Sequence, residues 1–291
     1  IEPYYTDIRR GRPPTEEALA DLVARYAAIG GVSPLAQLTE AQATALQSAL
    51  DAAEPGRFEG SLGLKHADPK VEVTARRVAE SGADAVIGLV LAPHYSSYSI
   101  GQYLDRTRQG VADSGVDIPV AGVDSWAIEP AFVEFLAADL AQRVGAMREQ
   151  TGGNVRVLFT AHSLPQRIID GGDPYPDELR ATADAVAARV GLVEGDDWQI
   201  AWQSAGRTPE PWIGPDILEV IDALGNDDDV AGVIVSACGF VADHLEVLYD
   251  LDIEAADRAR TRGLAFDRTA CVNDDPAIMA ALAERVRSLA P

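Results

Sequence analysis

Apolar residues recur along the chain in two patterns, short continuous runs and longer amphipathic stretches. The short runs contain many β-branched residues without strict alternation, which is typical of buried parallel strands. They predict strands at 58–64, 85–92, 120–123, 155–161, 198–203 and 230–237. The amphipathic stretches predict helices at 15–29, 39–53, 69–81, 100–114, 130–149, 175–190, 215–224, 241–249 and 276–289.

The predicted strands and helices alternate, and this order is typical of α/β proteins with parallel sheets. Three predicted strands precede Pro130 and three follow it, so we predict two similar domains at 1–130 and 131–291. In an alternative arrangement, the last helix of the second domain packs back on the first domain. A length of 291 residues suits two domains of average size.

The chain is strongly acidic, with 24 basic and 46 acidic side chains and a formal net charge of −22. This charge repels nucleic-acid phosphates and anionic membrane surfaces, so we expect no nucleic-acid partner. No P-loop, dinucleotide fingerprint or nucleophile elbow is found in the sequence. No apolar run is long enough for a membrane helix, so we expect no stable membrane insertion.

The two cysteines, Cys238 and Cys271, are too few for a disulfide framework, a four-cysteine zinc site or a four-cysteine iron–sulfur cluster. Their number fits a reducing, cytoplasmic setting. The chain does not begin with Met, and Ile1 stands where a helix is already being entered, so we expect the natural N-terminus to lie upstream.

Candidate chemistry gathers in the loops after the predicted strands, where open parallel sheets bind ligands. All four histidines, His66, His94, His162 and His244, stand at or just after a strand end. For His162 two interpretations stay open, a core residue bonded to a carbonyl, or a metal ligand and base whose pKa is near neutral by default. We favour a structural role in tight turns for His94 and His244, and an exposed loop position for His66.

Four acidic residues, Asp243, Glu246, Asp250 and Glu254, follow one another at spacings of 3, 4 and 4. On an α-helix these spacings place carboxylates on a single stripe. The stripe is either a solvated face of an acidic protein or a partly buried row, and the apolar residues between the acids favour the second. Such a row raises pKa values and favours bound protons or metal ions, so it suits proton relay or cation delivery.

Arginines concentrate near the start of the chain, and they either solvate the surface or bind the carboxylate groups of an anionic ligand. Tyrosines and tryptophans gather near the predicted strand ends, where they either fill the core or contact a flat apolar ligand. Neither pattern decides between its two interpretations.

Many of these residues lie in segments that resemble the ferrochelatase family, and most of all the soluble coproporphyrin ferrochelatases of Gram-positive bacteria. The matching segments are 4–12, 28–35, 63–66, 91–94, 161–165, 173–176, 202–204 and 239–250. They occur in the family's order and span nearly the whole chain, and the last one is long and highly specific.

The resemblance implies two Rossmann-like domains, each a parallel sheet flanked by helices, with a porphyrin cleft between them. It implies insertion of Fe²⁺ into a porphyrin, coproporphyrin III to coproheme, with release of two protons in heme biosynthesis. Fe²⁺ and the porphyrin are then substrates, and we expect no tightly bound cofactor, no iron–sulfur cluster, a cytoplasmic location and a monomer. The family's chains carry one strand and a loop before the region that matches Ile1, so we expect residues 1–291 alone to be poorly stable or active.

By the same resemblance, His162 and Glu246 are the catalytic metal-site pair, and we expect them to approach the porphyrin from different lobes. Asp250 and Glu254 resemble an outer acidic trail, and His66 lies near an outer cation site. The positions that hold the porphyrin and its propionates match Arg9, Arg10, Arg25, Tyr26, Ser33 and Tyr103.

Two other functions stay open beside this one. The chain resembles a chelatase in general, so the metal or tetrapyrrole could differ, with cobalt or protoporphyrin IX as examples. A noncatalytic tetrapyrrole carrier is the other alternative, although a carrier needs no row of carboxylates for protons. Sequence does not decide whether His162 or Glu246 takes the pyrrole protons.

Overall fold

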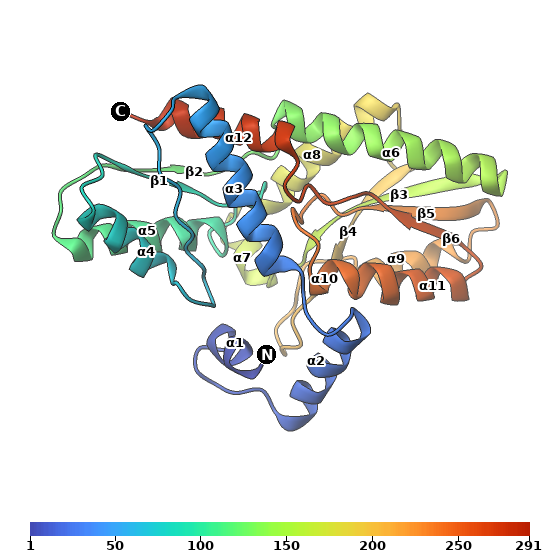
Figure 1. Cartoon of the computed structure of the whole chain (residues 1–291). Helices are drawn as coiled ribbons and strands as arrows, with labels where there is room; N and C mark the ends of the chain where they lie inside the picture. The colour runs from blue at the N-terminus through green and yellow to red at the C-terminus, as the bar shows by residue number, and fades with distance from the viewer. The chain divides into compact units, whose positions relative to one another are not determined.

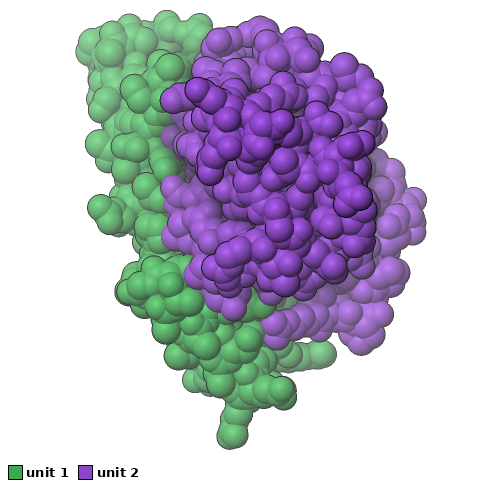
Figure 2. Space-filling view, turned by 90° about the vertical axis from the view of Figure 1, so that its right-hand side faces the viewer, with its two compact units in different colours: residues 1–91, 97–124, 273–291 green, residues 92–96, 125–272 purple.

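The computed structural model describes residues 1–291, which form two compact units (Figure 1). Unit 1 comprises residues 1–91, 97–124 and 273–291, and unit 2 comprises 92–96 and 125–272 (Figure 2). The chain therefore passes between the units at 91/92, 96/97, 124/125 and 272/273, and its C-terminal helix belongs to unit 1. None of the helices has both the length and the apolar composition needed to cross a membrane.

Unit 1 is a small parallel sheet covered by helices on both faces. Its elements are α1 (Glu2–Ile8), α2 (Glu16–Ala28), α3 (Leu35–Ala53), α4 (Val71–Glu80), β1 (Val86–Leu89), α5 (Ile100–Ser114), β2 (Val120–Val123) and α12 (Pro276–Leu289). Strand β1 pairs in parallel with β2. Leu50 of α3 and Val286 of α12 pack with Ile87 on one face. Val111 of α5 packs with Val86 in a separate cluster, because successive strand side chains point to opposite faces.

Unit 2 is built on a four-stranded parallel sheet with the order β4-β3-β5-β6. Its elements are α6 (Pro130–Thr151), β3 (Asn154–His162), α7 (Gln166–Asp170), α8 (Tyr175–Val190), β4 (Trp198–Gln203), α9 (Ile217–Leu224), β5 (Val230–Ser236), α10 (Leu245–Leu248), the π-helix η1 (Asp250–Ala255), α11 (Ala256–Thr261) and β6 (Ala265–Arg268). Helices α6 and α8 cover one face of this sheet, and α9, α10 and α11 cover the other (Figure 1).

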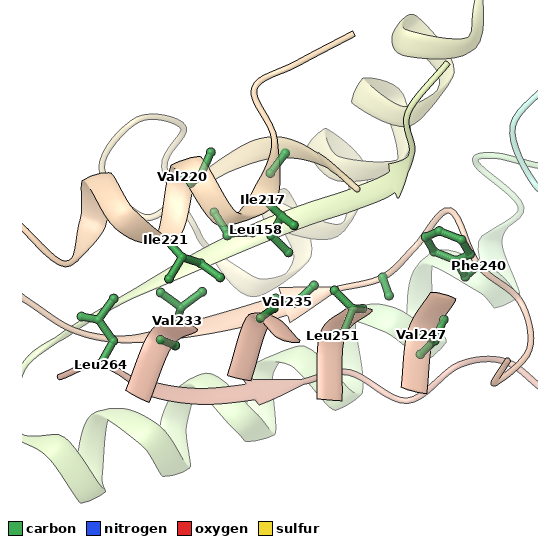
Figure 3. Packing of buried hydrophobic residues seen from close by; sticks show 14 of the residues in the cluster. Leu158, Ile217, Val220, Ile221, Val233, Val235, Phe240, Val247, Leu251 and Leu264 are labelled. Atoms are coloured by element: carbon green, nitrogen blue, oxygen red, sulfur yellow. The ribbon is translucent and has the colours of Figure 1, made fainter. Parts of the chain in front are cut away.

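One hydrophobic core of unit 2 lies between the sheet and α9, α10 and η1 (Figure 3). Leu158 of β3 and Val235 of β5 contribute to it from the sheet, and Ile221 contributes from α9. Val247 and Leu251 are fully buried in the same cluster. Val247 directly follows Glu246, and Leu251 directly follows Asp250. The two buried side chains therefore hold the segment that carries the acidic row against the core.

Most of the predicted elements are confirmed, several with the same bounds, namely the helices at 100–114, 175–190 and 276–289 and the strands at 120–123 and 198–203. The prediction of two similar halves with three strands each is wrong, because unit 1 has two strands and unit 2 has four. Strand β6 and the helices α1, α7 and α11 were not predicted. They are short, and a short element carries little periodicity.

The strand predicted at 58–64 does not form, because side chains bind its backbone. The Gln47 amide donates to Phe58 O at 3.0 Å and accepts from Gly60 N at 2.7 Å. Thr74 Oγ1 donates to Leu62 O at 2.8 Å. These hydrogen bonds replace a strand ladder, which satisfies the polar backbone groups without a neighbouring strand.

The close packing of α5 on α4 gives a test of the fold of unit 1. A Cβ on Gly110 would lie 2.3 Å from the backbone oxygen of Glu72 and 2.9 Å from Ala75 Cβ. We expect Gly110→Ala to lower the free energy of unfolding by about 1–3 kcal/mol, because the two helices must move apart. The measurement is urea-induced unfolding followed by circular dichroism.

The matched control is Gly145→Ala, since Gly145 is an exposed glycine of α6 with no atom within 4 Å of the added Cβ. Alanine favours helix over glycine, so this variant should raise the free energy of unfolding by about 0.5–1 kcal/mol. Equal stability of the two variants would show that α4 and α5 do not pack this closely.

Candidate active site

The candidate site lies where the strand order of unit 2 reverses. Strand β4 follows β3 in the chain and pairs on one side of it, whereas β5 pairs on its other side. Open parallel sheets bind ligands at the carboxyl ends of their strands beside such a reversal. His162 is the last residue of β3, so the chemistry predicted for the strand ends is found at this point.

His162 faces Glu246, with His162 Nε2 and Glu246 Oε1 3.5 Å apart. The other ring nitrogen, Nδ1, lies 2.5 Å from Ser163 O, and because a carbonyl only accepts, Nδ1 carries a hydrogen and Nε2 points to the carboxylate. The Tyr175 hydroxyl donates to the backbone oxygen of His162 at 3.1 Å. The imidazole is thus held in one orientation.

The expectation that these two residues come from different lobes is wrong, because both belong to unit 2. His162 ends β3, and Glu246 lies in α10, which follows β5. Since β3 and β5 are parallel neighbours, the chain leaves both strands at the same edge of the sheet. Both residues of the pair are therefore positioned by one sheet.

The charge state of His162 differs from the near-neutral default that the sequence suggested. Burial alone would lower the pKa of His162, but the charge of Glu246, the hydrogen bonds to Glu246 and Ser163 O, and the charge of Asp250 together raise it to about 9. At neutral pH the imidazole is therefore protonated and forms an ion pair with Glu246. The pair holds a proton at the position where a divalent cation could bind instead.

The backbone of Glu246 is fixed while its carboxylate stays accessible. Its N–H donates to His244 Nδ1 at 3.1 Å, and the buried Gln203 amide donates to its carbonyl oxygen at 2.9 Å. The Glu246 side chain is 42% exposed. His244 caps α10 in this way, so the structural role predicted for it is confirmed.

The structural role predicted for His94 is confirmed as well. His94 is buried, and its Nε2 lies 2.8 Å from Thr182 Oγ1. Burial lowers the pKa of His94 to about 3, so this imidazole is neutral over the physiological range. It holds the 92–96 segment against α8.

The acidic row does not form one α-helical stripe, so that prediction is wrong. Asp243 precedes the helix and accepts a hydrogen bond from Arg268 at 2.9 Å. Asp250 and Glu254 lie in the π-helix η1, where Glu254 N donates to Tyr249 O, five residues back, at 2.9 Å. Asp250 is buried, and Glu254 is partly buried. Neither unit contains a cluster of three or more His, Cys, Asp or Glu side chains placed to hold a metal ion.

Ser204 follows β4 and holds the buried Asp250. Its hydroxyl donates to Asp250 Oδ2 at 2.5 Å. The backbone of Ser204 has φ at +59°, a left-handed conformation that non-glycine residues rarely adopt and that concentrates at functional sites. No role is predicted from the sequence for Gln203 or Ser204, although both lie in the strand-end segment 202–204 that resembles the family.

Unit 1 contains the other candidate residues. The exposed position expected for His66 is not found, because its side chain is only 25% exposed and its Nδ1 lies 2.8 Å from Asp7 Oδ2. Burial lowers the pKa of His66 although Asp7 opposes this shift. Lys70 Nζ binds the second oxygen of Asp7 at 2.9 Å. The Tyr103 ring lies 5.6 Å from Lys65 Nζ.

The candidate arginines of unit 1 lie in α2 or directly after α1. Arg9 caps the end of α1, and Arg10 follows it with φ at +56°. Arg25 of α2 lies 3.2 Å from Asp21 and is followed by the partly buried Tyr26. Ser33 accepts from Leu35 N at 3.3 Å in the turn before α3.

Comparison with known proteins finds one family over nearly the whole chain. The ferrochelatase family profile matches residues 11–290. A coproporphyrin III ferrochelatase of Geobacillus thermodenitrificans is 40% identical over 284 residues, which cover 97% of this chain and 89% of that protein. A ferrochelatase of Herpetosiphon aurantiacus is 39% identical over 279 residues, covering 96% of this chain and 90% of that one.

A similar solved structure is that of SirB from Bacillus subtilis with Fe³⁺. It has a TM-score of 0.54 and 12% sequence identity, and the match covers 85% of this chain and 88% of that one. This likeness bears on the fold alone and agrees with the α/β architecture predicted from the sequence. The profile match and the identities over nearly the full length show that the chain belongs to the ferrochelatase family.

Proposed function

We propose that this chain is a coproporphyrin III ferrochelatase, a lyase that inserts Fe²⁺ into coproporphyrin III and releases two protons to form coproheme. The family membership and the names of the relatives support this reaction. The observation that carries the proposal is the facing pair His162 and Glu246, 3.5 Å apart at the strand ends of unit 2. An imidazole and a carboxylate together bind first-row divalent cations and accept protons.

His162 and Glu246 share metal delivery and proton removal in this proposal. A porphyrin with two N–H groups must lose both protons before its four nitrogens can hold the metal. His162 in turn must lose its own proton before Nε2 can bind Fe²⁺ or accept a pyrrole proton, because its pKa is raised to about 9. A cation that approaches Glu246 and Asp250 offsets their negative charge and lowers that pKa, so arrival of iron and release of the proton are coupled.

Asp250 and Glu254 form the outward route for cations and protons in this scheme, with His66 near an outer cation site. Their place on η1, directly after Glu246, supports the route. Guanidinium groups bind carboxylates in a planar, two-point geometry, which supports contacts with the porphyrin propionates. The residues proposed for porphyrin binding are Arg9, Arg10, Arg25, Tyr26, Ser33 and Tyr103.

We further propose that the enzyme works as a cytoplasmic monomer without an iron–sulfur cluster or other resident cofactor. Both cysteines are buried free thiols, which supports a reducing compartment. One imidazole and one carboxylate do not select iron over cobalt or zinc, so a different metal or tetrapyrrole is the second candidate.

The substrate is tested by anaerobic incubation of the protein with Fe²⁺ and each porphyrin, followed by absorbance. We expect kcat/KM with coproporphyrin III to exceed that with protoporphyrin IX by about tenfold or more, because a site built for several carboxylates disfavours an analogue with fewer. Co²⁺ in place of Fe²⁺ is the metal control. Faster insertion into protoporphyrin IX or of Co²⁺ would move the assignment to the second candidate, and binding without insertion would leave a carrier.

The catalytic pair is tested with His162→Ala and Glu246→Ala. We expect each to lower kcat by about 100-fold or more while porphyrin binding is retained, because each removes a group that handles metal and protons. Porphyrin fluorescence quenching measures the binding. Glu194→Ala is the control, since Glu194 pairs with Arg180 on the surface. Normal turnover by both pair variants would reject the assignment.

The raised pKa of His162 is tested by heteronuclear NMR of histidine-labelled protein. We expect the His162 ring to titrate near pH 9 and, in Glu246→Gln, at a lower pH, because the charge of Glu246 and its hydrogen bond both raise the pKa of His162. His94, with a pKa of about 3, should stay neutral throughout and serves as the internal control.

The same ion pair stabilises the fold only while His162 is protonated. Because the folded pKa is the higher one, this contribution is fully present below pH of about 6.5 and is lost as the pH rises through about 9. Glu246→Gln should therefore lower the free energy of unfolding more at about pH 6 than at about pH 10. An effect of the opposite sign, or a near-neutral pKa in the wild type, would contradict the ion pair.

A further inference from the structure

Arg268 ends strand β6, and its guanidinium holds two acidic side chains at once. Nε and Nη2 donate to the two carboxylate oxygens of Asp252 at 2.5 and 2.9 Å, which is a forked contact. Nη2 also donates to Asp243 Oδ1 at 2.9 Å, and Nη1 donates to Thr269 O at 3.1 Å. The Arg268 side chain is only 15% exposed, so these contacts are shielded from water more than ordinary surface ion pairs are.

The two acids stand on either side of the proposed iron-handling carboxylates. Asp243 precedes Glu246 by three residues, and Asp252 follows Asp250 by two. A single side chain therefore ties down both ends of the segment that presents Glu246 and Asp250. The segment has no regular α-helical frame through this stretch, because α10 is one turn long and η1 is a π-helix. Side chains must supply the rigidity that a longer α-helix would provide.

Arg268 is itself fixed to the sheet. It stands opposite Val235 in the parallel pairing of β6 with β5, and Thr269 N donates to Val235 O at 2.9 Å. β5 is also the neighbour of β3, which ends at His162. The guanidinium thus anchors the acidic segment to the same sheet that carries the imidazole. A lysine cannot do this in the same way, because one ammonium lacks the planar fork that meets two carboxylates.

We infer that Arg268 is a positioning residue for iron insertion, which sets where the carboxylates of Glu246 and Asp250 stand relative to His162 by holding Asp243 and Asp252. Arg268 touches neither metal nor porphyrin in this role. The inference rests on the proposed function, because the carboxylates that Arg268 positions are those proposed there to handle iron and protons. A shift of the acids by about an ångström costs up to roughly 100-fold in rate when reacting groups must be aligned.

The test compares Arg268→Lys with Arg143→Lys. Arg143 of α6 makes the same kind of double contact, with Asp139 at 2.9 Å and with Asp267 at 2.8 Å, but neither acid lies in the 243–254 segment. We expect Arg268→Lys to lower kcat roughly 10- to 100-fold with KM for coproporphyrin III changed by no more than about twofold. Arg143→Lys should keep the wild-type kcat. Circular dichroism and thermal unfolding measure whether the two variants are folded and equally stable.

Chemical rescue adds a readout that loss of stability would not produce. In Arg268→Ala, added guanidinium ion should restore part of kcat by occupying the place between Asp243 and Asp252, and ammonium should not. In Arg143→Ala, guanidinium should leave kcat unchanged. If Arg268→Ala does not fold, Arg268→Lys carries the test alone.

The outcomes separate this inference from the proposed function. If Glu246→Ala abolishes turnover while Arg268→Lys keeps the wild-type rate, only the positioning role of Arg268 is overturned. Equal losses of kcat in Arg268→Lys and Arg143→Lys would also overturn it, since a general loss of stability then explains both. A wild-type protein that inserts no metal into any porphyrin would overturn both the function and the inference.

Discussion

The site of unit 2 depends on the parallel pairing of β3 with β5 in the middle of its sheet. Both strands run in one direction, so His162 and the chain that leaves β5 emerge at the same edge. That chain crosses close to β3, where Gly239 N donates to Thr160 O at 2.9 Å. A Cβ on residue 239 would lie 2.3 Å from Ala161 Cβ, so the crossing requires glycine. The crossing leads into α10 and brings Glu246 to His162.

Sequence patterns predicted the elements whose ends carry local signals. Gly115 caps the end of α5 and Gly191 caps the end of α8, both with φ in the left-handed region, and the Asp275 side chain caps the start of α12. Such signals are read from a few neighbouring residues. The strand predicted at 58–64 does not form for the opposite reason, because its backbone is bound by a side chain from another element, Gln47 of α3.

The place of the candidate site could be predicted from the sequence, but its charge state and its supports could not. His162 was found because it follows a β-branched run, which is a local pattern. Its pKa depends on Glu246 and Asp250, which are far away in sequence and come close only through the sheet. The π-helix is likewise invisible to a spacing rule based on the α-helix. Arg268 gave no signal, because an arginine at a strand end is equally typical of a solvated surface.

The proposed reaction also explains why the site combines a cationic imidazole with an acidic segment. Fe²⁺ replaces two pyrrole protons, so each turnover brings in as much positive charge as it sends out. A segment that attracts Fe²⁺ through Glu246 and Asp250 also retains protons, and the pKa of about 9 at His162 expresses that retention. Iron carries twice the charge of a proton, so the same carboxylates favour the metal once its water is removed. Under the proposed function the site exchanges cations, and the arrangement of its acids decides which cation stays.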